Sequence, residues 1–509
     1  MIRPRLQKLP SALLLAVLVA ACGPQYGSQP QVDLTLLSTN DFHGNLEPTG
    51  AKYRDRPVGG AAFLATLIER ERQADPDGTL LLDGGDIVQG TALSNLTQGR
   101  ATIDFYNFAR YDAAAIGNHE FDWGVPVLVD RIEQAKFPLL AANIVEKSTG
   151  RAPPWAKPYQ VFTKKGLRIA VIGLITPDTP NVTLPQNVEP YRFLDPAEVA
   201  NRLIRELVPS RADLAVIVTH IGGEQKEGEP VTGEIVELAE AVQGEAAIVG
   251  GHTHQAVAGD VGGVPIVEAG SNARFLGKIH LRVDRKSRRV LEGRAEILPV
   301  YNDELTADPE AEALIAGHAK AVEPRLAEVL GEAEVPLEAE RRECPMGNFL
   351  SDLMRSTASA DLAFQNPGGV RSPIDAGPIQ YREVYRVMPF DNTIVVLEMT
   401  GAEVKQLLEQ AADKVGFLHA SGLRYAVDPN QPVGSRVTLR TPLEEARKYK
   451  VAVNNFMAQG GDGLTILANR PEARETGVVM REAMADFIRA ETRAGRKISA
   501  RVEGRVEMP

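Results

Sequence analysis

The stretch AIGNHEFDWG, residues 115–124, places an asparagine, a histidine and two acids directly after a short apolar run. Four further stretches also set polar side chains at the end of an apolar run: NDFHGN (40–45), LLDGGD (81–86), VTH (218–220) and GGHTH (250–254). Five of the chain's eight histidines lie in these stretches. Because α/β sheets carry their sites at the carboxyl ends of parallel strands, we expect these side chains to gather at one edge of a sheet.

The side chains in these stretches are of the types that bind divalent metal ions. Carboxylates, neutral imidazoles and an amide oxygen suit zinc, manganese or similar ions. Two neighbouring cations need a bridging anion, and Asp86 is the natural candidate. A single histidine at a strand end is often structural, but five such stretches in order favour a centre for two metal ions.

The surrounding chain has the pattern of two α/β units. Between Val32 and about Val300, near-continuous apolar runs alternate with amphipathic stretches, which indicates a sheet covered on both faces. We expect strands at 32–38, 79–85, 112–117, 167–175, 212–220 and 246–251, with helices at 59–73, 124–136, 196–208 and 232–243. A Glu/Ala/Leu-rich stretch, 303–335, is typical of a helical connector. In the second unit we expect strands at 361–366, 393–399 and 449–455, and helices at 345–358, 401–412 and 477–493.

Composition excludes several classes of protein. The chain has 509 residues, with 56 Lys and Arg against 67 Asp and Glu, a net charge of −11. This balance argues against a nucleic-acid binder, which needs a broad basic face, but it allows a small anionic substrate in a local basic pocket. The two cysteines, Cys22 and Cys344, exclude a disulfide framework. No feature of the sequence indicates an obligate protein partner.

The first 22 residues have the pattern of an export signal. Basic residues precede an apolar run, 11–21, that is too short to span a bilayer comfortably. The sequence VAACG (19–23) resembles a bacterial lipobox, which implies that Cys22 is lipidated and becomes the new N-terminus. Residues 23–31 would then be a tether, and the chain would be lipid-anchored to the bacterial cell envelope, facing the periplasm or the exterior. A plain secretory peptide with an incidental cysteine is the alternative.

The five stretches together resemble the sequence blocks of calcineurin-like dinuclear metallophosphoesterases, and the NDFHG and GNHEFD forms resemble the 5′-nucleotidase family. The resemblance implies an α/β fold with an N-terminal four-layer αββα sandwich (32–302), a helical linker (303–335) and a C-terminal α/β substrate-specificity domain (336–509). It implies two metal ions, one held by Asp41, His43, Asp86 and His254 and the other by Asp86, Asn118, His220 and His252. It also implies a catalytic dyad, in which protonated His119, oriented by Asp122, neutralises the departing alkoxide.

The second half resembles the same family in three further blocks: NPGGVR (366–371), MPF (388–390) and NNFMAQGGDG (454–463). They imply that Asn366 and Arg371 contact the substrate, with Arg371 on the phosphate. They also imply that Phe390 and Phe456 sandwich the nucleobase and that Asp462 accepts from the ribose hydroxyls. One departure concerns a family arginine, whose position is occupied here by Glu340; its displaced neighbours Arg341 and Arg342 are both candidates for that phosphate contact.

The resemblance implies hydrolysis of nucleoside 5′-monophosphates outside the cytoplasm, by metal-activated water and without a covalent intermediate. Three alternative activities would use the same fold: those of a UDP-sugar diphosphatase, a 2′,3′-cyclic-nucleotide phosphodiesterase and a thiosulfate-releasing hydrolase. The base-clamp residues argue against the sulfur substrate. An alternative of another class is a non-catalytic nucleotide-binding surface lipoprotein.

The lipid anchor predicts where the protein will be found. Cys22→Ser should release the protein from membranes, because the tether carries no other anchor. The measurement is the protein's distribution between the soluble fraction and membranes washed with high salt. A variant that stays with the washed membranes would contradict lipidation at Cys22.

Overall fold

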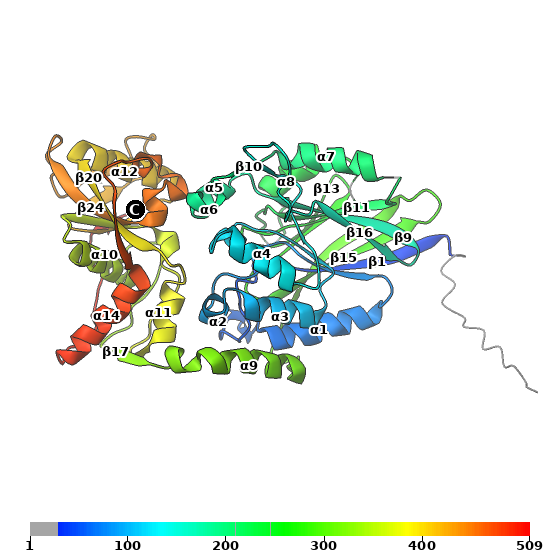
Figure 1. Ribbon diagram of the computed structural model, residues 1–509, viewed down its shortest axis with the longest axis horizontal. Helices are drawn as coiled ribbons and strands as arrows, with labels where there is room; N and C mark the ends of the chain where they lie inside the picture. Colours follow the sequence, from blue (N-terminus) through cyan, green and yellow to red (C-terminus); the bar gives the residue numbers. More distant parts are fainter. Residues whose placement is uncertain (1–28, 209, 227, 245, 509) are drawn as a thin grey trace, which may run out of the picture.

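The computed structural model describes residues 29–208, 210–226, 228–244 and 246–508, so the signal segment and Cys22 lie outside the described residues. The chain forms two units, and the long helix α9 (Pro309–Leu326) runs along both of them (Figure 1). Within the described ranges, no helix combines the length and apolar character needed to cross a bilayer.

The N-terminal unit contains two six-stranded sheets. In the first, ordered β16-β15-β1-β4-β5-β6, strands β1, β4, β5 and β6 are parallel, while β15 and β16 are antiparallel. The second is ordered β13-β14-β12-β11-β9-β8, with antiparallel strands at both edges. The strands are β1 (Gln31–Thr39), β4 (Thr79–Asp83), β5 (Ala113–Ala115), β6 (Leu139–Leu140), β15 (Phe275–Asp284), β16 (Val290–Pro299), β8 (Tyr159–Lys164), β9 (Leu167–Ile175), β11 (Leu214–His220), β12 (Ala247–Val249), β13 (Ala256–Val261) and β14 (Val264–Ala269).

Helices cover the outer face of each sheet. The first sheet packs on α1 (Ala61–Ala74), α3 (Arg100–Ala109) and α4 (Val125–Gln134), and the second on α7 (Pro196–Leu207) and α8 (Glu234–Ala241). A third apolar core fills the space between the sheets. The expected four-layer αββα sandwich is therefore confirmed. The apolar runs are continuous because both faces of the central strands are buried, as in β9.

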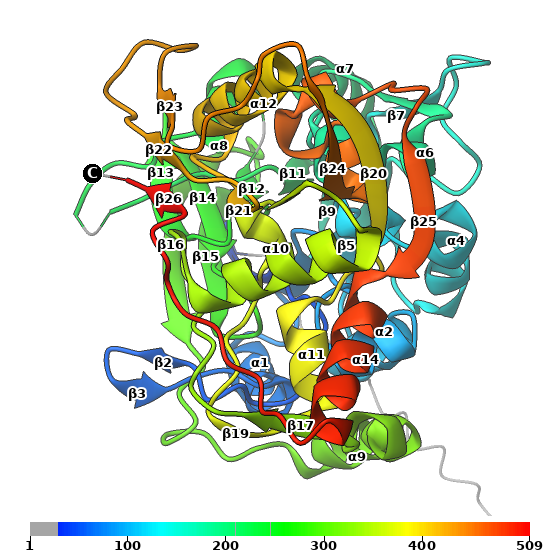
Figure 2. The ribbon, with the colours of Figure 1, turned by 90° about the vertical axis from the view of Figure 1, so that its left-hand side faces the viewer.

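The C-terminal unit is built on a five-stranded sheet, ordered β21-β18-β24-β20-β25. Helices α10 and α14 share an apolar core on one side of the unit, and α12 packs in a second core on the other (Figure 2). The elements are α10 (Pro345–Ala358), α11 (Tyr381–Val387), α12 (Gly401–Lys414), α14 (Met480–Arg493), β18 (Leu362–Gln365), β20 (Thr393–Thr400), β21 (His419–Ser421), β24 (Lys448–Asn454) and β25 (Arg474–Val479).

Short elements complete both units. They are β2 (Lys52–Tyr53), β3 (Arg56–Pro57), α2 (Ala92–Leu96), η1 (His119–Phe121), β7 (Ile144–Glu146), α5 (Thr179–Val182), α6 (Pro185–Val188), β10 (Tyr191–Phe193), β17 (Val329–Ala333), η2 (Pro367–Gly369), β19 (Gly377–Gln380), β22 (Tyr425–Val427), β23 (Val437–Leu439), α13 (Asn455–Ala458), η3 (Gly461–Gly463), η4 (Thr465–Leu467) and β26 (Val506–Glu507).

Two of the predicted helical segments have the wrong bounds. The connector expected over 303–335 is helical only in α9, because β17 pairs antiparallel with β19 of the C-terminal unit. At Gly331 in β17 a side chain would collide with Thr492 and Ile488 of α14, so this strand is fitted to that helix. The helix expected from residue 477 begins at Met480, because residues 474–479 form the edge strand β25.

The contacts between the two units include those of α9 and one buried hydrogen bond. Helix α9 contacts α1, α2 and α3 of the N-terminal unit and α11 of the C-terminal unit. Asn95 donates from Nδ2 to the carbonyl of Pro389 over 2.6 Å, immediately before Phe390. The C-terminal unit is therefore held against the edge of the first sheet that carries the polar stretches.

Close packing of the two N-terminal sheets predicts a strong effect at Gly173. A Cβ there would lie 2.3 Å from Cβ of Leu140 in the facing sheet. Gly173→Ala should therefore lower the stability of the protein by about 1–3 kcal/mol through overpacking, seen as a lower melting temperature. Gly317→Ala is the control, because it lies in exposed α9 with no atom near the new Cβ and should be neutral or stabilising. Equal melting temperatures for both variants would contradict this packing.

Candidate metal centre and substrate cleft

Two groups of predicted ligands face each other at the ends of the parallel strands. Asp41, His43 and His254 form the first group, in which the Nε2 atoms of His43 and His254 are 3.0 Å apart. Oδ1 of Asp41 lies 3.3 Å from Nε2 of His254 and 3.9 Å from Nε2 of His43. Asp41 and His43 follow strand β1 of the first sheet, whereas His254 lies between strands β12 and β13 of the second.

The second group contains Asp86, His220 and His252. Nε2 of His220 lies 3.1 Å from Oδ2 of Asp86, 3.2 Å from Nδ1 of His252 and 3.1 Å from Oδ1 of Asn118. Oδ2 of Asp86 also lies 3.9 Å from Nε2 of His43, in the first group. Asp86 thus faces both groups, the position that a bridging carboxylate requires.

The polar atoms of these groups fit divalent cations. Oδ1 of Asp41 is buried and receives no hydrogen bond from any described residue. Burial, reinforced by the charges of neighbouring histidines, lowers the pKa of His43 to about 3 and that of His252 to about 4, so both imidazoles are neutral. Burial opposes protonation of His220 too, but the Asp86 carboxylate raises its pKa to about 10; a cation would replace that proton.

The backbone at five of the ligands is left-handed. The φ angles are +47° at Asp41, +50° at His43, +58° at Asp86, +87° at His252 and +59° at His254. Such angles are uncommon outside glycine and tend to cluster at functional sites, where the surrounding structure enforces them. Each strand therefore ends in a sharp turn that aims its side chain at a common point.

A buried carboxylate, Glu120, holds two of the ligand loops. It accepts hydrogen bonds from the backbone N–H groups of Asp86 (3.0 Å), Ile87 (2.8 Å) and Gly117 (2.7 Å). Burial and the nearby charge of Asp86 raise the pKa of Glu120 to about 7. The loops also need glycine at Gly117, where a Cβ would lie 2.2 Å from Oδ1 of Asp86.

Backbone carbonyls fix two of the ligand rings. Nδ1 of His43 lies 2.7 Å from the carbonyl of Gln89, and Nδ1 of His220 lies 2.9 Å from the carbonyl of Gly84. When these Nδ1 atoms donate to the carbonyls, the Nε2 atoms are left free to bind a cation, an arrangement usual for metal-binding histidines.

The predicted dyad lies beside the second group. Nδ1 of His119 is 2.8 Å from Oδ2 of Asp122, because the short helix η1 brings residues three apart onto one side. Burial alone would lower the pKa of His119, but the carboxylates of Asp122 and Asp86 raise it to about 9. The backbone N–H of His119 donates to Oδ1 of Asp86 over 2.9 Å, which fixes the dyad relative to the metal groups.

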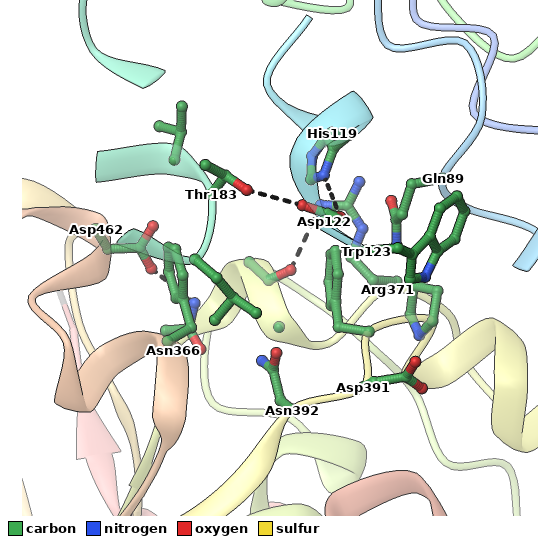
Figure 3. Close-up of a pocket in the computed structure, with 17 residues that line it drawn as sticks. Gln89, His119, Asp122, Trp123, Thr183, Asn366, Arg371, Asp391, Asn392 and Asp462 are labelled. Carbon is green, nitrogen blue, oxygen red and sulfur yellow. Dashed lines mark hydrogen bonds and ion pairs between the residues drawn. The ribbon is translucent and has the colours of Figure 1, made fainter. Parts of the chain in front are cut away.

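A cavity of about 180 Å³ opens between the units at the predicted dyad (Figure 3). His119 and Asp122 line the cavity from the N-terminal unit. From the C-terminal unit come all five of the substrate residues expected in the blocks 366–371, 388–390 and 454–463: Asn366, Arg371, Phe390, Phe456 and Asp462.

Contacts inside the cavity arrange these residues. Asn366 donates from Nδ2 to Oδ2 of Asp462 over 2.6 Å. The ring of Phe456 lies against Gly461, where a Cβ would come within 2.5 Å of it. The ring of Phe390 lies nearly parallel to that of His119, with centroids 6.0 Å apart. Phe390 therefore lies beside the predicted dyad, and Phe456 lines the same cavity.

Of the three candidate arginines, Arg371 alone lines this cavity. Arg341 and Arg342 line a separate hollow near the C-terminus, and Arg342 pairs with Glu340. Desolvation by the surrounding protein lowers the pKa of Arg371, which keeps solvent contact along the cavity, and the positive charge of Arg341 lowers it further. The structure thus brings Arg341 into electrostatic range of the cavity and ties Arg342 to Glu340.

Several residues of the site were not predicted from the sequence. Glu120 holds the ligand loops, and Gln89, Trp123 and Thr183 line the cavity. Nε2 of Gln89 is buried without an acceptor in the described part of the chain. Glu120 and Trp123 lie inside the block 115–124, and their position in that block could have indicated a role in the site.

Comparison with known proteins agrees with this geometry. Residues 34–256 match the family model of the calcineurin-like phosphoesterases, and residues 327–469 match that of the 5′-nucleotidase C-terminal domain. The fold and the site thus define a two-part metallophosphoesterase.

The relatives are more specific. Protein UshA of Yersinia enterocolitica is 30% identical over 509 residues, covering 90% of each chain. The crystal structure of the 5′-nucleotidase precursor from Thermus thermophilus has 33% identity and a TM-score of 0.82, covering 94% of this chain and 99% of that one. Endonuclease YhcR of Bacillus subtilis is 28% identical over 85% of this chain, which spans 38% of YhcR's length. The chain belongs to the 5′-nucleotidase family of metal-dependent phosphoester hydrolases.

The position of Asp86 between the two groups predicts a loss of metal. Asp86→Asn should leave fewer than two ions per chain and lower activity by orders of magnitude, because the two cations would lose their bridging anion. Metal content after dialysis is the measurement. Asp83→Asn is the matched control, because Asp83 ends β4 three residues before Asp86, and burial raises the pKa of its carboxyl to about 8, which leaves it largely neutral at pH 7. Normal metal content in the Asp86 variant would refute the bridging role.

Proposed function

We propose that this protein hydrolyses nucleoside 5′-monophosphates to nucleoside and phosphate without a covalent intermediate. The observation that carries the proposal is the shared cavity, in which the His119–Asp122 pair lies opposite Phe456 and the hydrogen-bonded pair Asn366 and Asp462. A nucleotide bound in this cavity would place its phosphate near the two groups of predicted metal ligands and its nucleoside between the two units. Both parts of the nucleotide would then contact the protein.

Each residue has a defined part in this reaction. Two divalent ions held by Asp41, His43, Asp86, Asn118, His220, His252 and His254 would supply an activated water and neutralise phosphate charge. His119 donates a proton to the departing 5′-oxygen, and Asp122 holds the ring and stabilises its positive charge. Arg371 pairs with phosphate oxygens, for which its planar guanidinium is suited.

The nucleoside is bound by the C-terminal unit. Phe390 and Phe456 offer aromatic faces to the base, and every base can stack on such a face. The carboxylate of Asp462 accepts from the ribose hydroxyls, while its other contact to Asn366 keeps it oriented. Arg341 reinforces the positive potential around Arg371 from outside the cavity.

We further propose that the protein acts outside the cytoplasm, attached to the cell envelope by lipid on Cys22. On this view residues 1–21 of the signal segment 1–22 are removed and Cys22 becomes the lipidated N-terminus; 23–31 form a tether, 32–302 form the metal-binding domain and 336–509 the substrate domain. The support is the lipobox-like VAACG sequence and the short apolar run before it.

Hydrolysis of a panel of substrates, with each product identified, tests the activity. The panel should contain AMP, UMP, ATP, UDP-glucose, 2′,3′-cyclic AMP and bis-p-nitrophenyl phosphate, with EDTA treatment followed by zinc or manganese. We expect the highest kcat/KM for a 5′-monophosphate, loss of activity with EDTA and recovery with metal. Preference for UDP-glucose or for the diesters would instead establish a diphosphatase or a phosphodiesterase on this scaffold.

The base clamp predicts a substrate-selective defect in Phe456→Ala. Stacking on one aromatic ring is worth roughly 1–3 kcal/mol, so kcat/KM for AMP should fall about tenfold or more. Activity on p-nitrophenyl phosphate, which has no nucleobase, should change much less. Phe487→Ala is the control, because Phe487 packs against Phe349 in the core of the same unit, and both activities should then change together. Parallel losses in the Phe456 variant would overturn the clamp.

A further inference from the structure

The segment 176–188 lies between the two units. It follows β9 and contains the short helices α5 and α6, which face the C-terminal unit in Figure 1. Helix α5 packs against η3, the turn that carries Asp462. Val182, Thr183 and Leu184 of this segment line the cavity opposite the C-terminal residues. The segment therefore contacts both the dyad and the ribose side of the cavity.

Thr183 makes a direct hydrogen bond to the dyad (Figure 3). Its hydroxyl donates to Oδ1 of Asp122 over 3.0 Å, while Oδ2 of the same carboxylate lies 2.8 Å from Nδ1 of His119. Thr183 is only 2% exposed, so water competes little for this contact. A carboxylate with a single partner can rotate about its Cβ–Cγ bond, whereas a second donor on the other oxygen fixes its plane.

The segment also fixes the backbone of the dyad and one predicted metal ligand. Asn187 donates from Nδ2 to the carbonyls of Phe121 (2.8 Å) and Asp122 (3.0 Å). Asn118 donates from Nδ2 to the carbonyl of Val182 over 3.1 Å, which turns its Oδ1 toward His220. These contacts join the segment to the dyad at several points, and Thr183 is the one that contacts the Asp122 carboxylate.

We propose that Thr183 is a positioning residue for the His119–Asp122 dyad. Thr183 is held in place by the segment 176–188, which packs against the substrate domain. The inference rests on the acid role of His119 in the proposed function. By holding the plane of the Asp122 carboxylate, Thr183 keeps Nε2 of His119 directed at the departing oxygen. Substrate contacts at η3 stabilise the same segment from its other side.

Two substrates and three variants test this role. Thr183→Val keeps the side-chain shape but removes the hydroxyl, and Thr183→Ser keeps the hydroxyl. Thr179→Val is the matched control, because Thr179 is buried in the same segment and its hydroxyl bonds the carbonyl of Thr176 over 2.7 Å, away from the dyad. Turnover is measured on AMP and on p-nitrophenyl phosphate, whose leaving group needs little protonation, alongside melting curves.

We expect Thr183→Val to lower kcat for AMP by about tenfold to a hundredfold, the range for a lost hydrogen bond to a charged group. Turnover of p-nitrophenyl phosphate should fall less than about threefold. Thr183→Ser should restore most of the AMP activity, and Thr179→Val should change both substrates alike. Equal losses on both substrates in Thr183→Val, or no loss on either, would overturn the proposal.

A double-variant comparison separates this proposal from the proposed function. If Thr183 acts through Asp122, adding Thr183→Val to Asp122→Asn should cost little beyond the single Asp122 variant. If the two losses multiply, Thr183 acts independently of the dyad and the inference is wrong, while nucleotide hydrolysis by the unaltered protein still stands. Failure of the unaltered protein to hydrolyse AMP would instead refute the proposed function, and with it this inference.

Discussion

The Asp86 carboxylate faces two groups of predicted metal ligands at once, and much of the N-terminal unit serves to hold it there. Its own turn is left-handed, its backbone N–H is bound by Glu120, and its Oδ1 receives the N–H of His119. Gly117 lies so close that no side chain could be accommodated. A small shift of this one side chain would move both groups and the dyad together, because all three are joined to it.

Much of the fold and the predicted ligand set could be derived from the sequence because the information is local. Each predicted ligand lies at the end of an apolar strand or within five residues after it. Strands buried on both faces give clear apolar runs, as β9 and β11 do. The predicted dyad came from the family resemblance of one short stretch, which contains both His119 and Asp122. Parallel strands then bring these separate stretches to one edge without further information.

What the sequence did not predict depends on contacts between distant segments. Thr183 lies 61 residues from Asp122, and nothing in its own neighbourhood marks it as a partner of the dyad. The connector was misread near its end because residues 329–333 are strand only through pairing with β19. The displaced arginines could not be separated either, since the distinction between Arg341 and Arg342 depends on Glu340 and on the position of Arg371.

The first ligand group has a consequence for when and where the protein acquires its metal. His43 and His254 are separated by 211 residues and come from different sheets, so the group forms only when both sheets are in place. The left-handed turns that aim these side chains exist only when both sheets have assembled. If these residues hold a metal ion, its binding is coupled to completion of this fold, and the ions available are those of the compartment in which folding finishes. For an exported chain, the composition of that compartment selects the metal more strongly than the small differences in affinity among similar ions.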